Sequence, residues 1–436
     1  MKYQSDDHND NYFTRTIIYR LYPNKQAQIR FNHYCDYRRY VWNKFKDLND
    51  YAYQAYLYEK NYYANVGLKV KSKDFCSKYP TLYGLKPIMN SNKKAWEYKY
   101  PSKIALMAMT DYDNALRNYK NKALPDWGKP KFRSKRNPRQ GFKLPSSSVK
   151  TNNNVIILAK GRADKKHKAL TLHSRQKFLD YSFGTVSFYT EKGRYYVSVP
   201  YYVPKKDLLV NDPSNLRVGI DLNVSHYNFY DGKTYNLNIK LKQLNRHYQR
   251  VKHYQRLLAK KRLVSSKNKQ SHNYADVRAK LQREYTKINN LQTDFLQKMI
   301  TKLCQRYHSI VIEDLDVKHM KMGLASKGLH RAMFGNFRQI LTYKAEQYNV
   351  DLIIADRFYP STQRCSQCGF IKTGDDKITL WGNKKHHTRH DQYVCYNCGA
   401  KIDRDDNAAT NLYEYPELDW NSNRINEFYR KERKIL

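Results

Sequence analysis

The sequence is poor in long apolar runs. No apolar stretch among its 436 residues approaches the roughly 20 residues that a membrane-spanning helix needs. The first residues, MKYQSDDHNDNYFTRT, also lack the apolar core of a secretory signal peptide. We therefore expect a cytoplasmic protein with no membrane partner.

Acidic residues are scarce as well. The chain has 39 Asp and Glu residues against 81 Lys and Arg residues, which gives a formal net charge of +42. Such an excess repels itself in the folded state unless a polyanion neutralises it, and nucleic acid is the polyanion that fits best. A basic surface kept only for solubility needs less charge. The 41 tyrosines can stack on bases or simply pack.

Cysteine is the third scarce residue, with seven in the chain. Cys35, Cys76 and Cys304 stand alone and are expected to be buried or unreactive. The other four form two CxxC pairs, Cys365 with Cys368 and Cys395 with Cys398. In a reducing compartment this spacing favours metal over disulfides, and it predicts a closed, tetrahedral Zn²⁺ site that supports the fold.

Three histidines, His386, His387 and His390, lie between the two cysteine pairs. One of them could replace a cysteine ligand or build a second metal site. We interpret their segment, WGNKKHHTRH, as a basic loop that faces nucleic acid.

The first half of the chain predicts a helical segment flanked by strands. Residues 14–22 form a β-branched run that predicts a strand, and helical spacing follows from Lys25 and again over residues 102–122. Residues 125–145 mix Lys and Arg with Gly and Pro, which predicts a basic loop. The later runs NVIILAK and GTVSFYTEKGRYYVSVPYYV predict a small antiparallel barrel or sheet that the first strand completes.

The second half has a different pattern of predicted strands and helices, and we place a domain boundary near Asp212 and Pro213. The segment LRVGIDLNVSHYNFYDGKTYNLNI predicts three antiparallel strands, with the second turn at Asp231 and Gly232. A helical hairpin over about 240–306 follows, then the strand SIVIEDL, a helix and the strand VDLIIADRF. This is the chain order of an RNase H-like fold, a mixed sheet flanked by helices.

Three acidic residues stand out in that order. Asp221 ends the first strand and Glu313 ends the fourth, so both are expected at one edge of the sheet. Asp405, in DRDDNAATNL, could reach that edge from a helix. Three converging carboxylates without a matching cluster of cations repel unless divalent ions lie between them, and their oxygen atoms suit Mg²⁺ or Mn²⁺. An unpaired carboxylate in an apolar strand is costly, which singles out the first two.

Spacing alone leaves alternatives open. Asp314 and Asp316 compete with Glu313, while Asp403 and Asp406 compete with Asp405.

With these residues aligned, the chain resembles the TnpB family of transposon-associated RNA-guided nucleases, which is related to type V CRISPR effectors. The matching segments are RLYPNKQAQ, RRYVWN, GKPKFRSK, GIDLNV, KINNLQTDFLQKM, VIEDLDVKHM, ADRFYPSTQRCSQCG, CYNCG and DRDDNAATNL. The resemblance implies that Asp221, Glu313 and Asp405 are the catalytic acids of an active nuclease. Its implied partners are a guide RNA made from the transposon end and a double-stranded DNA target with a short target-adjacent motif.

The resemblance also implies an α/β multidomain fold. A β-barrel wedge domain is interrupted by a helical recognition domain, and an RNase H-like (RuvC) nuclease domain carries a zinc-ribbon insertion. The implied ranges are 1–24 and 125–212 for the wedge domain, 25–124 for the recognition domain, 213–360 and 402–420 for the nuclease domain, 361–401 for the zinc ribbon and 421–436 for a C-terminal tail.

We therefore expect an RNA-guided, metal-dependent DNA endonuclease. One alternative is an RNA-guided DNA-binding repressor without cleavage, which the three intact acids oppose. Another is an RNase H-type transposase, which would need an end-binding domain such as a helix-turn-helix, and no segment convincingly predicts one. The sequence leaves the oligomeric state open.

Overall fold

The computed structural model describes residues 11–71, 74–122, 127–191, 193–208, 216–223, 225–239, 242–264, 272–315, 333–379 and 381–418. The chain divides into two compact units, Met1–Asp207 and Leu208–Leu436. The expected boundary near Asp212 and the expected tail at 421–436 lie outside the described residues. The finer domain ranges remain predictions.

The N-terminal unit contains two antiparallel sheets. The larger has the order β1 (Tyr12–Leu21), β7 (Arg194–Pro204), β6 (Val186–Glu191) and β2 (Arg139–Leu144). The smaller has the order β3 (Val149–Asn152), β4 (Val155–Leu158) and β5 (Leu170–His173). The first predicted strand does complete the larger sheet, along β7. In the described residues a bridge between Leu21 and Ser174 joins the two sheets. The antiparallel strands of the expected barrel or sheet are present, and closure into a barrel remains a prediction.

Residues 127–138 have no helix or strand, as expected, but strand β2 corrects the expected loop over residues 139–144. Its glycine, Gly141, opposes Tyr189 of β6, and a Cβ added at 141 would lie 2.4 Å from the carbonyl oxygen of Phe188. The glycine that signalled a loop instead allows close approach between two strands.

Helices α1 (Lys25–Asn65), α2 (Leu82–Ser91) and α3 (Ser102–Lys120) belong to the same unit. The side chain of Asn24 caps α1 by accepting a hydrogen bond of 2.8 Å from the amide of Ala27. The expected apolar stripe of α1, which includes Phe31, Val41 and Phe45, is buried in a core shared with both sheets. Short 3₁₀ turns cover Ala95–Lys99, Ser146–Ser148 and Lys205–Asp207.

The C-terminal unit is built on a five-stranded mixed sheet. Its order is β10 (Thr234–Asn238), β9 (His226–Tyr230), β8 (Arg217–Leu222), β11 (Ser309–Glu313) and β12 (Asp351–Ala355). The first three strands are antiparallel, and β11 runs parallel to both β8 and β12. The three predicted strands and the turn at Asp231 and Gly232 are confirmed, with Gly232 at a φ of 102°.

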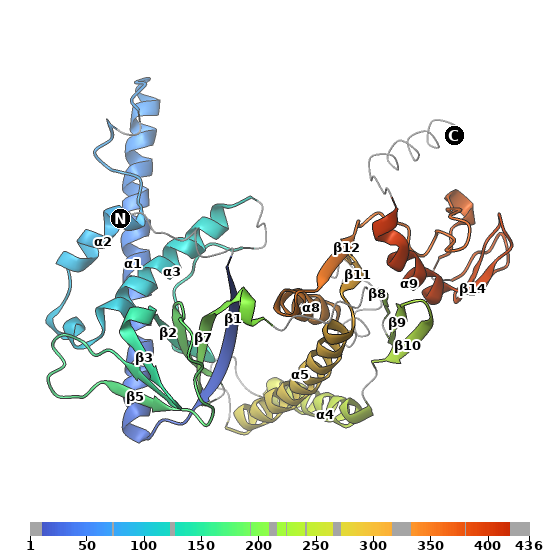
Figure 1. The fold of residues 1–436 in the computed structure, drawn as a ribbon. Helices are drawn as coiled ribbons and strands as arrows, with labels where there is room; N and C mark the ends of the chain where they lie inside the picture. Colours follow the sequence, from blue (N-terminus) through green and yellow to red (C-terminus); the bar gives the residue numbers. More distant parts are fainter. Residues whose placement is uncertain are drawn as a thin grey trace. The chain divides into compact units, whose positions relative to one another are not determined.

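Helices cover both faces of this sheet (Figure 1). Helices α5 (His272–Arg306) and α8 (Phe334–Tyr348) cover one face and α9 (Arg404–Glu414) the other, while α4 (Lys242–Val264) packs on α5. Val218, Ile220, Ile310 and Ile312 of the central strands are buried in one core with α5 and α8. Because side chains alternate along a strand, the residues between them face α9. Val311 accordingly packs with Leu412 of α9.

A small cysteine-containing element follows β12. It includes the 3₁₀ turn Gly374–Asp376 and the antiparallel strands β13 (Gln392–Val394) and β14 (Lys401–Asp403), and a 3₁₀ turn at Tyr415–Glu417 follows α9. None of the described helices has the length and apolarity needed to cross a membrane.

Candidate functional site

The strand register places Asp221 and Glu313 side by side. In the parallel pair of β8 and β11, Ile220 lies opposite Ile312. Asp221 and Glu313 are the next residue of each strand, and both point to the face that α9 covers. Asp221 is followed by Leu222 within β8, so it is the penultimate residue of its strand, while Glu313 ends β11.

Helix α9 carries Asp405 to this edge of the sheet. The helix lies very close to β8 at Gly219, where an added Cβ would be 2.3 Å from the carbonyl oxygen of Ala409 and 2.4 Å from the amide nitrogen of Tyr413. Only glycine at position 219 allows this approach. The negative charge of Asp405 consequently acts on Asp221.

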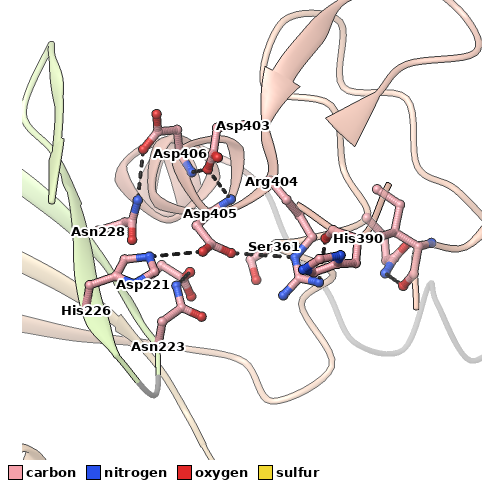
Figure 2. Close-up of polar contacts among 12 residues, drawn as sticks. Asp221, Asn223, His226, Asn228, Ser361, His390, Asp403, Arg404, Asp405 and Asp406 are labelled. Atoms are coloured by element: carbon pink, nitrogen blue, oxygen red, sulfur yellow. Dashed lines mark hydrogen bonds and ion pairs between the residues drawn. The ribbon is translucent and has the colours of Figure 1, made fainter. Parts of the chain in front are cut away.

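Asp405 lies between two basic side chains, as Figure 2 shows. Nε2 of His226 is 3.2 Å from its Oδ2, and Nε of Arg404 is 3.6 Å from its Oδ1. Nδ1 of His226 is 2.8 Å from the hydroxyl of Ser225, and Arg404 donates a hydrogen bond of 3.0 Å to the carbonyl of His390. Arg404 thus places one positive charge beside Asp405.

Asp221 sits in an environment that disfavours its negative charge. Burial raises its pKa well above the usual value, and the charges of Glu313 and Asp405 raise it further. A hydrogen bond of 2.8 Å from Nδ2 of Asn223 and the positive charge of Arg404 oppose the shift. A side chain that is 5% exposed in this setting ionises readily only when additional positive charge is close.

The pKa of Glu313 is also raised. Burial raises its pKa and Asp405 adds to the shift, while a hydrogen bond from Ser361 and the charge of Arg404 oppose it. The hydroxyl of Ser361 lies 2.5 Å from Oε1 of Glu313.

The competitors of Asp405 have other contacts. Asp403 is the N-cap of α9, and its Oδ1 accepts hydrogen bonds from the amides of Asp405 at 2.9 Å and Asp406 at 3.2 Å. Asp406 accepts a hydrogen bond of 2.9 Å from Nδ2 of Asn228. Of the three, Asp405 is the one whose charge acts on Asp221 and Glu313.

Of the two alternatives to Glu313, Asp314 and Asp316, the structure describes only the first. Asp314 forms ion pairs with Arg338 and, at 3.1 Å, with Arg357. The hydrogen bond from Arg338 is the main cause that lowers the pKa of Asp314. Asp316 lies outside the described residues.

The three acids offer the oxygen ligands that Mg²⁺ and Mn²⁺ prefer. Within the part of the chain that the structure describes, they are not gathered into a compact ligand group of the kind that the cysteines form. Divalent positive charge would relieve the repulsion that raises the pKa of Asp221, so the residues fit such an ion.

The four cysteines form a compact ligand group. Among the described residues, their Sγ atoms all lie within 4.8 Å of one another. Sγ of Cys365 is 3.8 Å from that of Cys398, and Sγ of Cys368 is 3.6 Å from that of Cys395. Zn–S bonds of about 2.3 Å in a tetrahedron separate the sulfur atoms by about 3.8 Å. The group therefore fits Zn²⁺.

His386 is used elsewhere. Its Nε2 lies 2.8 Å from Oδ1 of Asp376, and its ring stacks on Tyr396 with 3.8 Å between centroids. In the described residues, no histidine joins the cysteine group. That the surrounding loop faces nucleic acid remains a prediction.

Buried hydrogen bonds connect the cysteine element to the acids. Ser361, which bonds to Glu313, accepts a hydrogen bond of 2.7 Å at its carbonyl from Nδ2 of Asn411 in α9. Nδ2 of Asn411 also donates to the carbonyl of Arg364 at 2.7 Å, and the Arg364 side chain donates to Oδ1 of Asn411 at 2.7 Å. Asn411 is fully buried, and Arg364 directly precedes Cys365. Helix α9 thus holds both the third acid and the segment that leads into the cysteine group.

Sequence reasoning missed the polar residues that surround the acids, namely His226, Asn228, Ser361, Arg404 and Asn411. Asn228 could have been found, because it interrupts the apolar strand HYNFY and lies opposite Asp221 in the register. Ser361 and Asn411 carry no such signal, since their partners are about 50 positions away along the chain.

Three family models match parts of the chain. Residues 334–412 match a model described as a Cas12f1-like TNB domain, residues 198–323 one described as a probable transposase, and residues 13–57 one described as a helix-turn-helix domain. The first range includes the cysteines and Asp405, and the second includes Asp221 and Glu313. Over 13–57, this structure has β1 followed by part of the single helix α1.

Curated relatives match over part of their length. A protein of Streptomyces pristinaespiralis named "Putative RNA-guided DNA endonuclease" is 34% identical over 147 residues, 34% of either chain. The TnpB-like protein L79 of Acanthamoeba polyphaga mimivirus is 25% identical over 250 residues, 54% of this chain and 44% of the relative. The matches thus span about a third to less than a half of these relatives.

A solved structure shares the fold. It is titled as a Cas12f1–sgRNA–target DNA complex, and it matches with a TM-score of 0.55 and 13% identity over 92% of this chain and 99% of the other. At this identity the match concerns the α/β multidomain fold alone. Together with the family models and relatives, it confirms the resemblance to the TnpB family that the motifs predicted.

Proposed function

We propose that this relative of TnpB is an RNA-guided DNA endonuclease that hydrolyses phosphodiester bonds at Asp221, Glu313 and Asp405. The observation that carries the proposal is a buried carboxyl group, Asp221, whose pKa is raised by burial and by the charges of the other two acids. Functional sites are where such costly arrangements occur, because they need the charge for chemistry.

The acids would act as ligands for divalent cations. Bound there, two Mg²⁺ or Mn²⁺ ions would supply charge that activates a water molecule and stabilises the leaving oxygen. Asp221 and Glu313 hold fixed positions on neighbouring strands, and Asp405 approaches from α9. His226 and Arg404 orient Asp405, and Arg404 partly offsets the negative charge of the cluster.

The proposed partners are a guide RNA and double-stranded DNA. The net charge of +42 suits a protein that holds nucleic acid by its backbone, with base pairing to the guide supplying specificity. Curated relatives named as putative RNA-guided DNA endonucleases support this assignment. By the same resemblance, the guide would come from the transposon end, and the protein would read a short target-adjacent motif.

The finer fold assignment is part of the same proposal. The strand order of the second unit, with helices on both faces, supports an RNase H-like nuclease domain of the RuvC type. The four cysteines support a zinc ribbon inserted before α9. The sheets and helices of the first unit would form the wedge and recognition domains.

The test begins with the RNA that co-purifies with the protein. Its sequence identifies the guide segment, from which a plasmid target with randomised flanking bases is designed. In Mg²⁺, the ribonucleoprotein is expected to linearise plasmids that match the guide and carry one flanking motif. Plasmid that is bound and shifted but stays circular would favour the repressor, and joined strand-transfer products would favour a transposase.

A further inference from the structure

The N-terminal unit contains a cavity of about 390 Å³ between α1 and the strands β2 and β6. Five cationic side chains contribute to its lining, namely Arg38, Arg39, Arg133, Arg139 and Lys143. No carboxylate is among the lining residues. The cavity therefore presents mainly donors and positive charge to whatever enters it.

Two carboxylates behind the cavity wall neutralise part of this charge. Asp111 pairs with Arg38 at 2.8 Å and with Lys143 at 2.7 Å, and Asp36 pairs with Arg39 at 2.8 Å. Three of the five cations thus pair with two carboxylates. Charge beyond what the protein itself neutralises is left for an anion.

Arg38 and Arg133 have the least satisfied guanidinium groups of this cavity. Nε of Arg38 is buried and has no hydrogen-bond partner. Burial lowers the pKa of Arg133 to about 10, and the positive charge of Arg38 contributes to the shift. An anion between the two guanidinium groups would supply the missing acceptor and remove their mutual repulsion.

Aromatic rings fix two of the guanidinium planes. Arg133 lies over Trp42, with Cζ 3.8 Å from a ring centroid, and Arg139 lies over Tyr189 at 3.9 Å. Tyr189 in turn stacks on Tyr196. Among the described residues, neither Arg133 nor Arg139 has a carboxylate within ion-pair distance. Stacked guanidinium groups keep their N–H edges free for phosphate or base oxygens, and their planes can hold a base.

The volume restricts the ligand. Cavities that hold small ligands measure about 300–1,000 Å³, so this one accepts a single nucleotide and is too small for a duplex. Unstacked nucleotides are commonly held between phosphate-binding arginines and aromatic or guanidinium planes. The phenyl rings of Phe142 and Phe188, stacked with centroids 5.1 Å apart, supply an apolar part of the lining.

We propose that this cavity binds one unstacked nucleotide of a nucleic-acid strand, with its phosphate on Arg38 and Arg133 and its base against Arg139. This rests on the proposed function only in taking nucleic acid as the partner. Guide RNA and target DNA share this chemistry, so the experiment treats them separately.

The test compares Arg139→Gln with Arg136→Gln in the full-length protein. Arg136 is an exposed arginine of the same segment that does not line the cavity, so both variants lose one charge. One arm measures guide-RNA affinity at fixed salt, and the other measures binding of uncleaved target DNA to the ribonucleoprotein in Ca²⁺. A nucleotide-resolution footprint is recorded for each complex.

In one of the two arms, Arg139→Gln is expected to weaken binding by about tenfold, the effect of about 1.4 kcal/mol, while Arg136→Gln changes it about twofold or less. That arm should also show one reactive, unstacked nucleotide whose protection is lost in Arg139→Gln. Equal losses for both variants, or a footprint without such a nucleotide, would overturn the proposal. Neither binding nor footprints require cleavage. The proposal can therefore be tested even if the protein has no nuclease activity.

Discussion

At the scale of single residues, the proposed chemistry depends on a buried carboxyl group. Asp221 is 5% exposed, and burial together with Glu313 and Asp405 raises its pKa. An isolated aspartate in such a position would be a poor choice for stability. Its presence makes sense where a cation shares the site, and two measurements follow from its pKa.

The first concerns the pH dependence of cleavage. Because the pKa of Asp221 is raised, the group takes up a proton at a higher pH than an ordinary aspartate, and the protonated form binds cations poorly. Cleavage is expected to fall as the pH drops through this raised value. A higher Mg²⁺ concentration competes with the proton and should move the midpoint to lower pH. Cleavage rates against pH at two Mg²⁺ concentrations check this, and a midpoint that ignores Mg²⁺ would contradict it.

The second measurement is thermal unfolding of the protein in the absence of Mg²⁺, with Zn²⁺ kept bound. A raised carboxyl pKa means that the folded state holds a proton more tightly than the unfolded state, so this stability is present at low pH and is lost as pH rises through the folded pKa. Asp221→Asn is therefore expected to raise Tm at pH 7, by roughly 2–4 °C for each kcal/mol gained.

Asp314→Asn is the matched control of opposite sign. Arg338 and Arg357 lower the pKa of Asp314, so its ionised form stabilises the fold and its removal should lower Tm. Thermal unfolding of both variants checks the pair. A lower Tm for Asp221→Asn would show that the carboxylate is not strained.

The acids could be selected from the sequence because they interrupt apolar strands. Asp221 and Glu313 both do so, and their register follows from the pairing of β8 with β11. The sequence pattern does not distinguish Asp405 from Asp403, because both lie in the same short motif. Asp403 caps α9 because the backbone turns at that residue, so that its Oδ1 accepts from the amide of Asp405. The spacing of the acids along the sequence does not show where that turn lies.

At the scale of elements, the site depends on how closely α9 packs on β8. Gly219→Ala is expected to push the helix away, because its Cβ would fall 2.3 Å from the carbonyl oxygen of Ala409. Overpacking of this kind costs about 1–3 kcal/mol, and a displacement of about 1 Å at a catalytic group can cost 100-fold in rate. Cleavage rate and Tm measure both effects.

Gly335→Ala is the matched control for this substitution. Gly335 lies in α8, and an added Cβ there would have nothing within 4 Å. Alanine favours a helix over glycine, so this variant should retain cleavage and gain slightly in stability. Equal activity of the two variants would show that close packing of α9 is not required.

The hydrogen bonds around Ser361 link a second pair of elements. Ser361→Ala removes the donor to Glu313, and outer hydrogen bonds of this kind typically contribute about 10–100-fold to metal affinity or activity. We expect the Mg²⁺ concentration for half-maximal cleavage to rise, and Ser361→Thr to restore it. Titrations of cleavage with Mg²⁺ check this, with Zn²⁺ content measured in parallel. An unchanged Mg²⁺ requirement in Ser361→Ala would contradict a positioning role.

Element types were largely predictable, and the exceptions have a common cause. Apolar spacing predicts the long amphipathic helix α1 and the strands of the five-stranded sheet in the second unit. Strand β2 was missed because its glycine and basic residues are typical of loops. In the structure, Gly141 instead allows β2 to approach β6 closely. The division of the first unit into two sheets depends on which strands pair, and local spacing does not determine pairing.

At the scale of the whole molecule, charge and architecture indicate the same kind of partner. A chain with a net charge of +42 presents a basic N-terminal unit and, in the second unit, a buried acidic cluster beside a cysteine group. Positive charge that binds a polyanion and acids that bind cations are the two requirements of a metal-dependent nuclease. Composition predicted the first requirement, and the fold brings together the residues for the second.

The central claim is that the acids beside Asp221 cut guide-matched DNA. The most direct measurement compares Mg²⁺-dependent cleavage of a guide-matched duplex by the wild-type ribonucleoprotein, Asp221→Ala and Asp314→Ala, with guide-RNA affinity measured for each. We predict that Asp221→Ala loses cleavage while its RNA binding is unchanged, and that Asp314→Ala still cuts. Undiminished cleavage by Asp221→Ala would contradict it.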